Sequence, residues 1–132
     1  MTLSGWMRNA LWATGVMNVG AAFAFAPSGQ ALRAVAGFPD GEPLYLATSS
    51  LFVLLFGVGY LWSAAVGRAD RIFITIAAIG KLSFVALVVT YWLAGALPAR
   101  AVLVASGDVV FGVLFLAWLA GIGVPEASTH AA

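Results

Sequence analysis

Three polar side chains of this chain could take part in proton transfer or bind the polar end of a ligand. They are Asn18, Lys81 and Asp108, and each lies inside a long apolar run. Lys81 is the single charge between Ile72 and Leu97, a stretch long enough to cross a bilayer. A charged side chain at the bilayer centre costs roughly 2.5–3.5 kcal/mol on insertion scales, so such residues mark functional sites by default.

The spacing of these residues places all three at a similar depth. Asn18 lies ten residues after Arg8, and Lys81 lies ten residues after Arg71. At a helical rise of about 1.5 Å per residue, each is about 15 Å from its end of the span. Asp108 approaches from the opposite end, about 12 Å deep, and the hydrocarbon core is about 30 Å thick. We therefore predict that Lys81 pairs with Asp108 and that Asn18 satisfies the remaining donors.

The helical faces of these residues predict that they point into a helix bundle. Asn18 shares its face with small residues, and so does Asp108: Ala10, Thr14, Ala22 and Ala26 for the first, and Ala101, Ala105 and Gly112 for the second. Small residues let neighbouring helices approach closely. Lys81 shares its face with Ala77, Val88 and Trp92.

These positions define the predicted site. The candidate ligand-binding residues are Asn18, Lys81, Asp108, Tyr91 and Trp92. Asp108 and Lys81 are also candidate catalytic residues, with Asp108 as a general acid. The alternative is a structural polar clamp that fixes the register of the helices.

The composition predicts an integral membrane protein. Of the 132 residues, 63% are hydrophobic and only 8% are charged, whereas about 25% are charged in a soluble domain. The net charge of +1 provides no basic field for nucleic acid. Cysteine is absent and His130 is the only histidine, which excludes disulfides and a histidine metal cluster within one chain. We predict no metal and no cofactor.

Four apolar runs predict an all-α fold, an up-down four-helix transmembrane bundle. The predicted helices cover about residues 7–26, 45–66, 72–97 and 101–124, in a single domain over residues 1–126 with a flexible tail at 127–132. Short turns make the second and third helices, and the third and fourth, antiparallel neighbours. The first run resembles a signal peptide, but its length and the following proline predict a retained helix.

The remaining features concern the ends of the bundle. Residues 27–44 hold three prolines and three glycines and predict a solvated connection, with a lid over a cavity as the alternative. Tryptophans and tyrosines, Tyr60 and Trp118 among them, predict two interfacial belts. The arginines predict both termini inside, because Arg8, Arg68 and Arg71 share one side. The equal spacing of Asn18 and Lys81 from an arginine suggests a repeat, but the second helix offers no counterpart of Asp108.

Three short motifs resemble the DoxX-like group of small bacterial four-helix membrane proteins. The motifs are Gly57-Val58-Gly59-Tyr60, Gly80-Lys81-Leu82 and Gly107-Asp108, and the resemblance covers most of the chain in length and topology. It implies a bacterial inner-membrane protein with a lipophilic or quinone-type partner, because members of that group are linked to quinone-coupled oxidation. This chain lacks cysteines and a set of redox-cofactor ligands, so we predict a non-redox role.

The predicted function is therefore the binding of a lipophilic small molecule, whether a lipid, an isoprenoid or a quinone-like compound. Its polar end would meet Asn18, Lys81 and Asp108. Two alternatives stay open: a small proton-coupled transporter or channel subunit that acts as a homo-oligomer, and a structural subunit of a membrane complex. A binding protein predicts a one-ended apolar cavity that touches Asp108, a transporter predicts water access from both sides, and a structural subunit predicts a well-filled bundle.

Overall fold

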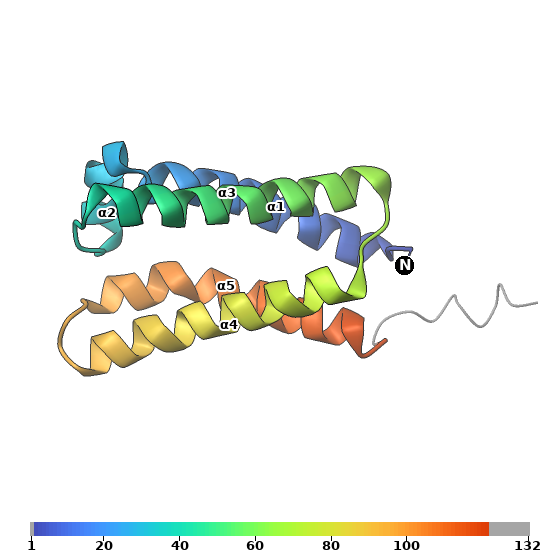
Figure 1. The fold of residues 1–132 in the computed structure, drawn as a ribbon. Helices are drawn as coiled ribbons and strands as arrows, with labels where there is room; N and C mark the ends of the chain where they lie inside the picture. The colour runs from blue at the N-terminus through green and yellow to red at the C-terminus, as the bar shows by residue number, and fades with distance from the viewer. Residues whose placement is uncertain (1, 122–132) are drawn as a thin grey trace, which may run out of the picture.

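The computed structural model describes residues 2–121, and within that range every regular element is helical (Figure 1). The elements in chain order are α1 (Gly5–Phe25), the 3-10 helix η1 (Pro27–Gly29), α2 (Gln30–Ala36), α3 (Pro43–Val66), α4 (Arg71–Leu93) and α5 (Ala99–Leu119). The prediction of an all-α fold is confirmed for these residues. The predicted tail at 127–132 and His130 lie outside the described part of the chain.

Local sequence signals set the helix ends. Asp70 caps α4, since its carboxylate accepts hydrogen bonds from the backbone N–H groups of Ile72 and Phe73. α3 ends at Gly67, whose φ of 77° is a left-handed conformation that glycine adopts without strain. α4 ends at Leu93, earlier than the predicted residue 97, because the chain turns through Gly95 at φ 81°. Likewise α5 ends at Leu119 and not at 124.

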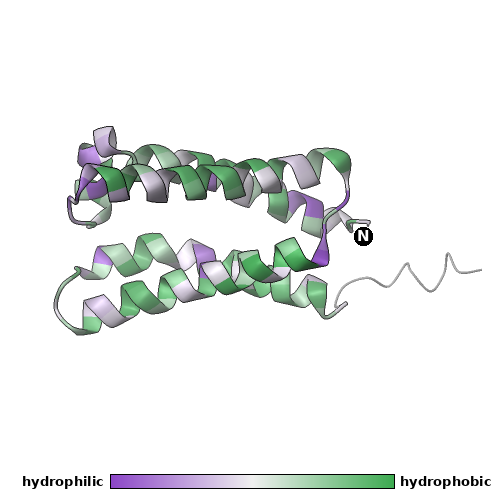
Figure 2. Cartoon of the chain, viewed as in Figure 1, coloured by the Kyte–Doolittle hydropathy of each residue, from purple (hydrophilic) through white to green (hydrophobic). Residues whose placement is uncertain are grey.

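Three helices, α3, α4 and α5, are long and apolar enough to cross a membrane. A fourth span results if α1 and the segment Pro27–Ala36 count as one, although they are bent by 87°. The bend follows from Pro27, which has no N–H to continue the helix and holds Ala26 in an extended conformation. Figure 2 shows hydrophobic residues over most of the helices and hydrophilic residues concentrated at the two ends.

The four long helices form two antiparallel hairpins. α1 packs along α3, and α4 packs along α5, while the two pairs face each other (Figure 1). The α1–α3 contact is close because a Cβ atom at Gly15 would lie 3.3 Å from the carbonyl oxygen of Gly57. The predicted packing of the third helix against the fourth is confirmed. The main partner of α3 is α1, however, and not its chain neighbour α4.

The two hairpins share a pattern of contacts, although only the first has η1 and α2 in its connection. Two matched contacts relate them. The Nε atom of Arg8 donates to the carbonyl oxygen of Ala64 at 2.7 Å, and Nη2 of Arg71 donates to that of Leu119 at 2.8 Å. The two acceptor residues, Ala64 of α3 and Leu119 of α5, are separated by the same number of residues as Val53 of α3 and Asp108 of α5. Arg8 of α1 therefore binds the C-terminal end of α3, and Arg71 of α4 binds the C-terminal end of α5.

The same interval also aligns sequence in α3 and α5. Pro43 is the first residue of α3 and Pro98 is the N-cap of α5. Both helices carry Phe-Gly-Val at the same distance from this proline, at residues 56–58 and 111–113. α1 and α4 run in one direction and α3 and α5 in the other (Figure 1). The hairpins are thus parallel repeats. As expected, the second helix has no acidic counterpart of Asp108, but Val53 occupies that position and its backbone carbonyl accepts a hydrogen bond from Asn18.

Candidate functional site

Lys81 joins the two hairpins through a hydrogen-bonded network. Its Nζ atom lies 2.6 Å from Oδ1 of Asp108 and 3.3 Å from Oδ1 of Asn18. Asn18 in turn donates from Nδ2 to the carbonyl oxygen of Val53 at 3.1 Å. The network connects α1, α3, α4 and α5. The predicted contacts of Lys81 with Asp108 and with Asn18 are confirmed.

The surroundings of Lys81 are apolar and aromatic. Only 6% of Lys81 is exposed, and its Nζ atom lies 5.4 Å from the ring centre of Tyr60 and 5.8 Å from that of Phe111. Such distances allow cation–π attraction, which is stronger when the cation is desolvated. Asp108 is more accessible, at 19%. Beside it, Gly107 carries no Cβ, so the Met17 side chain of α1 approaches α5 at this level.

A cavity of about 240 Å³ lies between the hairpins and ends on this network. Apolar and aromatic side chains form most of its wall, and the polar groups are gathered in one part of it. The lining residues are Met17, Asn18, Ala21, Phe25, Phe52, Val53, Phe56, Tyr60, Ala77, Gly80, Lys81, Phe84 and Asp108. Phe52 and Gly80 are exposed. The cavity therefore opens sideways between α3 and α4.

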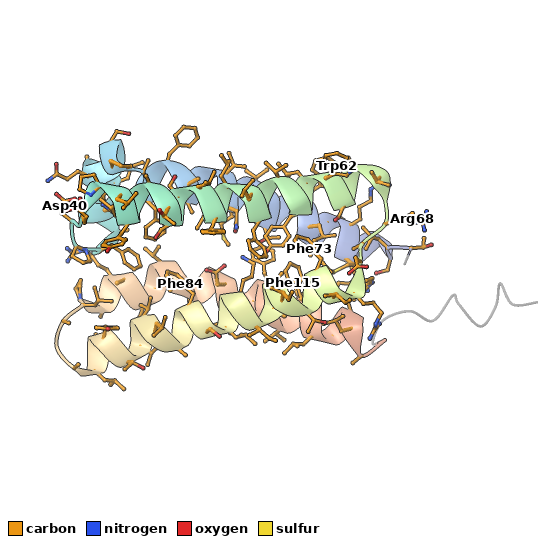
Figure 3. All side chains as sticks on the ribbon, viewed as in Figure 1. Asp40, Trp62, Arg68, Phe73, Phe84 and Phe115 are labelled. Carbon is orange, nitrogen blue, oxygen red and sulfur yellow. The ribbon has the colours of Figure 1, made fainter. Side chains whose placement is uncertain are left out.

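Aromatic clusters close both ends of the cavity. Toward the α3–α4 turn, the Phe73 ring of α4 lies 5.7 Å from Phe56 and 5.6 Å from Tyr60 of α3. Figure 3 shows side chains filling the space between the hairpins around Phe73. At the other end, Phe38 lies 5.5 Å from Phe25 and 6.1 Å from Phe84. The exposed lining residues Phe52 and Gly80 lie between these two clusters along the chain of α3 and α4.

Most residues of the connection between α1 and α3 are exposed, in agreement with the predicted solvated connection, but a few side chains pack inward. Arg33 is only 2% exposed, and its Nη1 atom donates to the carbonyl oxygens of Ala24 and Ala26 at the end of α1. Its Nη2 atom lies 2.8 Å from Oδ1 of Asp40. The Arg33 guanidinium holds the pKa of Asp40 below its usual value. Since Phe38 packs on two rings that line the cavity, this segment covers one end of it.

The structure does not bring every predicted site residue together. Tyr91 and Trp92 lie in the last turn of α4, 55% and 40% exposed, and do not line the cavity. We therefore leave them out of the candidate site. Tyr60 and Trp118 are both 2% exposed, so their assignment to an interfacial belt is wrong.

Tyr60 is the cavity residue that the sequence reasoning missed. A signal for it exists, because Gly57, Tyr60 and Ala64 are spaced by three and four residues and are the buried residues of α3. This spacing predicts a face turned toward the interior. Phe52 and Phe56 precede Tyr60 at intervals of four residues, so the same spacing places their rings on this face.

The chemistry open to this site is the binding of a polar group and the transfer of a proton. Lys81 is the only donor to Asp108 within residues 2–121, so the carboxylate can accept a further hydrogen bond. No group of three or more histidine, cysteine, aspartate or glutamate side chains in the described residues could hold a metal ion.

Comparisons of the chain with family models, with curated proteins and with solved structures find no match. The resemblance to the DoxX-like group stays a prediction. The geometry of the cavity and its polar network is therefore the basis on which a function is proposed.

Proposed function

We propose that this chain is an integral membrane protein that binds a lipophilic small molecule in the cavity between its hairpins. The four long helices would cross the bilayer as an up-down bundle, with the ligand's polar end at Lys81, Asp108 and Asn18. The observation that carries the proposal is an apolar cavity of about 240 Å³ that ends on a buried ion pair. Ligand sites are typically apolar clefts with a few convergent polar groups.

The position of the opening supports a ligand that arrives from the membrane. The exposed lining residues Phe52 and Gly80 belong to α3 and α4, whose outer faces are apolar. In a bilayer this opening faces lipid tails. A molecule dissolved in the hydrocarbon core would reach Lys81 without crossing water. Lipid, isoprenoid and quinone-like molecules share this route.

Asp108 is the residue to which we assign any proton transfer. Its carboxylate borders the cavity and holds one hydrogen bond, from Lys81. Lys81 contacts the carboxylate at 2.6 Å and is itself held by Asn18 at 3.3 Å. Asp108 would exchange a proton with a bound ligand, and Lys81 would position it.

A second candidate function is proton-coupled transport by a homo-oligomer, and the repeat favours it. Transporters built from parallel repeats place their substrate site at the repeat interface near the bilayer midplane. Here Lys81 and Asp108 lie between two parallel hairpins. The arginines Arg8, Arg68 and Arg71 gather at one end, which favours both termini inside a bacterial inner membrane. Proton-dependent flux in proteoliposomes, abolished by Asp108→Asn, would select this function over simple binding.

The binding proposal is tested by filling the cavity. A side chain at Gly80 would enter open space, because a Cβ atom there has no neighbour within 4 Å. Gly80→Leu should therefore keep the fold and block the cavity. Gly20→Leu is the matched control, since Gly20 is equally open but does not line the cavity.

Native mass spectrometry of the protein released from detergent provides the measurement. The wild type and Gly20→Leu should retain a bound lipophilic molecule, and Gly80→Leu should lose it. Equal retention by all three proteins would show that the molecule binds elsewhere, and no bound molecule in the wild type would refute the proposal. The same spectra report the number of copies.

A further inference from the structure

We infer that the ligand is an uncharged, ring-bearing molecule whose polar end is a hydroxyl group. The inference rests on the proposed function, because it concerns the same cavity. It names the chemistry that the cavity recognises, and three properties of the lining residues carry it: their net charge, their free hydrogen-bonding capacity, and their shape.

The net charge of the cavity favours a neutral ligand. Lys81 is compensated by Asp108 at 2.6 Å, and no other charged residue among those described lines the cavity. An anionic end group would lie beside the Asp108 carboxylate, and a cationic one beside the Lys81 ammonium. In apolar surroundings the repulsion between like charges is several times stronger than in water. A neutral end group avoids both contacts.

The free hydrogen-bonding capacity favours a hydroxyl group. Asp108 accepts from Lys81 through Oδ1, so the carboxylate has further acceptor capacity and no proton to give when ionised. Lys81 has three N–H donors, and Asp108 and Asn18 take two of them. The vacant positions therefore include an acceptor on Asp108 and a donor on Lys81, which are adjacent groups. A hydroxyl oxygen donates to the first and accepts from the second, whereas a ketone or an ether oxygen only accepts.

The shape of the cavity favours a flat ring system. Five rings contribute to its wall: Phe25, Phe52, Phe56, Tyr60 and Phe84. Aromatic side chains bind rings in stacked or edge-to-face arrangements. The volume of about 240 Å³ exceeds the roughly 150 Å³ of a cavity that holds benzene. The polar end of the ligand and one or two fused rings fill such a space, and a longer apolar tail would leave through the opening between α3 and α4.

A series of naphthalene derivatives tests these properties one at a time. The probes are 2-naphthol, 2-methoxynaphthalene, naphthalene and 2-naphthoate, which share a ring system and differ in the end group. Binding to the protein in lipid nanodiscs is measured by equilibrium dialysis at pH 7, with empty nanodiscs to subtract partition into lipid. We expect 2-naphthol to bind roughly ten- to hundredfold more tightly than the methoxy compound and naphthalene, because hydrogen bonds to charged groups are the stronger ones. The naphthoate should bind most weakly.

A charge variant gives the converse test. Asp108→Asn leaves Lys81 without its counter-ion, so the preference should shift at least tenfold toward 2-naphthoate. Ser106→Ala is the control on the same helix, because Ser106 is exposed and bonds only to its own helix at Leu103. It should leave the order of the four probes unchanged.

The outcomes separate the two proposals. Equal binding of naphthalene and 2-naphthol would support an apolar cavity but overturn the hydroxyl assignment, as would tightest binding of 2-naphthoate by the wild type. If no probe binds above empty nanodiscs, both proposals are overturned. The wild-type series is decisive even if Asp108→Asn does not fold.

Discussion

Removing one partner of the Lys81–Asp108 pair should cost more than removing both. Lys81→Met keeps the length of the side chain and removes its charge, and Asp108→Leu does the same for the carboxylate. Each single variant leaves a charge without its partner in apolar surroundings. The double variant leaves no charge, and its two apolar side chains occupy similar volume. A double-mutant cycle therefore isolates the interaction of the pair.

The exposed fractions of the Lys81 and Asp108 side chains set the expected loss of unfolding free energy. Loss of one partner from a buried ion pair costs about 3–5 kcal/mol. Lys81 is 6% exposed, but Asp108 is 19% exposed and borders a cavity, so the lower end of that range applies. We expect each single variant to lose about 3 kcal/mol of unfolding free energy. The double variant should lose less than either, so the coupling energy should be at least about 3 kcal/mol.

Unfolding in mixed micelles provides the assay. Increasing mole fractions of sodium dodecyl sulfate unfold the protein, and the fluorescence of its five tryptophans follows the transition. A parallel cycle that combines Lys81→Met with Ser106→Ala is the control, because Ser106 takes no part in the network. Those two changes should be additive within about 0.5 kcal/mol.

Additivity of Lys81→Met and Asp108→Leu would refute the reasoning. It would mean that the two groups do not stabilise each other, although their atoms lie 2.6 Å apart. A double variant less stable than both single variants would contradict the expectation that removing both groups costs less than removing one. Asn18, at 3.3 Å from Lys81, would then be the stronger partner of the lysine.

The remaining predictions concern the ends of the bundle and the packing within the hairpins. Arg33 lowers the pKa of Asp40 from the usual 3.8, so the folded state binds a proton less readily than the unfolded state. The resulting stability is present above the unfolded pKa and is lost as pH falls through the folded pKa. The melting temperature of the wild type should therefore drop on acidification below about pH 4 more than that of Asp40→Asn, with Glu42→Gln behaving like the wild type; equal slopes for all three would contradict the Arg33–Asp40 contact. Gly57→Ala should lose about 1–3 kcal/mol of unfolding free energy, since its Cβ would meet backbone atoms of α1 at 3.3 Å. Gly112→Ala should lose less, because its Cβ would meet the Leu82 side chain, at Cδ2 and Cγ, and no backbone atom. The same unfolding assay checks the order, and the reverse order would show that the hairpins are not packed as described.

The polar network was predictable from the sequence because the free-energy cost of a charge in an apolar helix can be read from that helix alone. A lysine or an aspartate inside an apolar helix needs a partner, and the helical rise fixes the depth at which that partner must lie. With Lys81 and Asp108 at the same level of neighbouring helices, pairing followed without knowledge of the packing. The helix ends beside Pro27 and Asp70 were predictable for the same reason, since these residues act on the neighbouring backbone, whereas the C-terminal ends of α4 and α5 were not.

The repeat was only partly visible in the sequence. The matched positions of Arg8 and Arg71 could be read, but the counterpart of Asp108 could not, since it is the backbone carbonyl of Val53. Every residue has such a carbonyl, so no residue type marks the one that accepts from Asn18. The repeat became clear when the contacts of both hairpins were compared.

The sequence by itself determined the class of fold and the polar centre, because hydropathy, helix length and the cost of buried charge act along one helix at a time. Tertiary structure decided which helices pair: α3 packs against α1, since Gly15 and Gly57 allow their backbones to approach. It also decided that Tyr60 faces the cavity while Trp92 lies outside it. Those outcomes depend on how two surfaces fit together, and no single span carries that information.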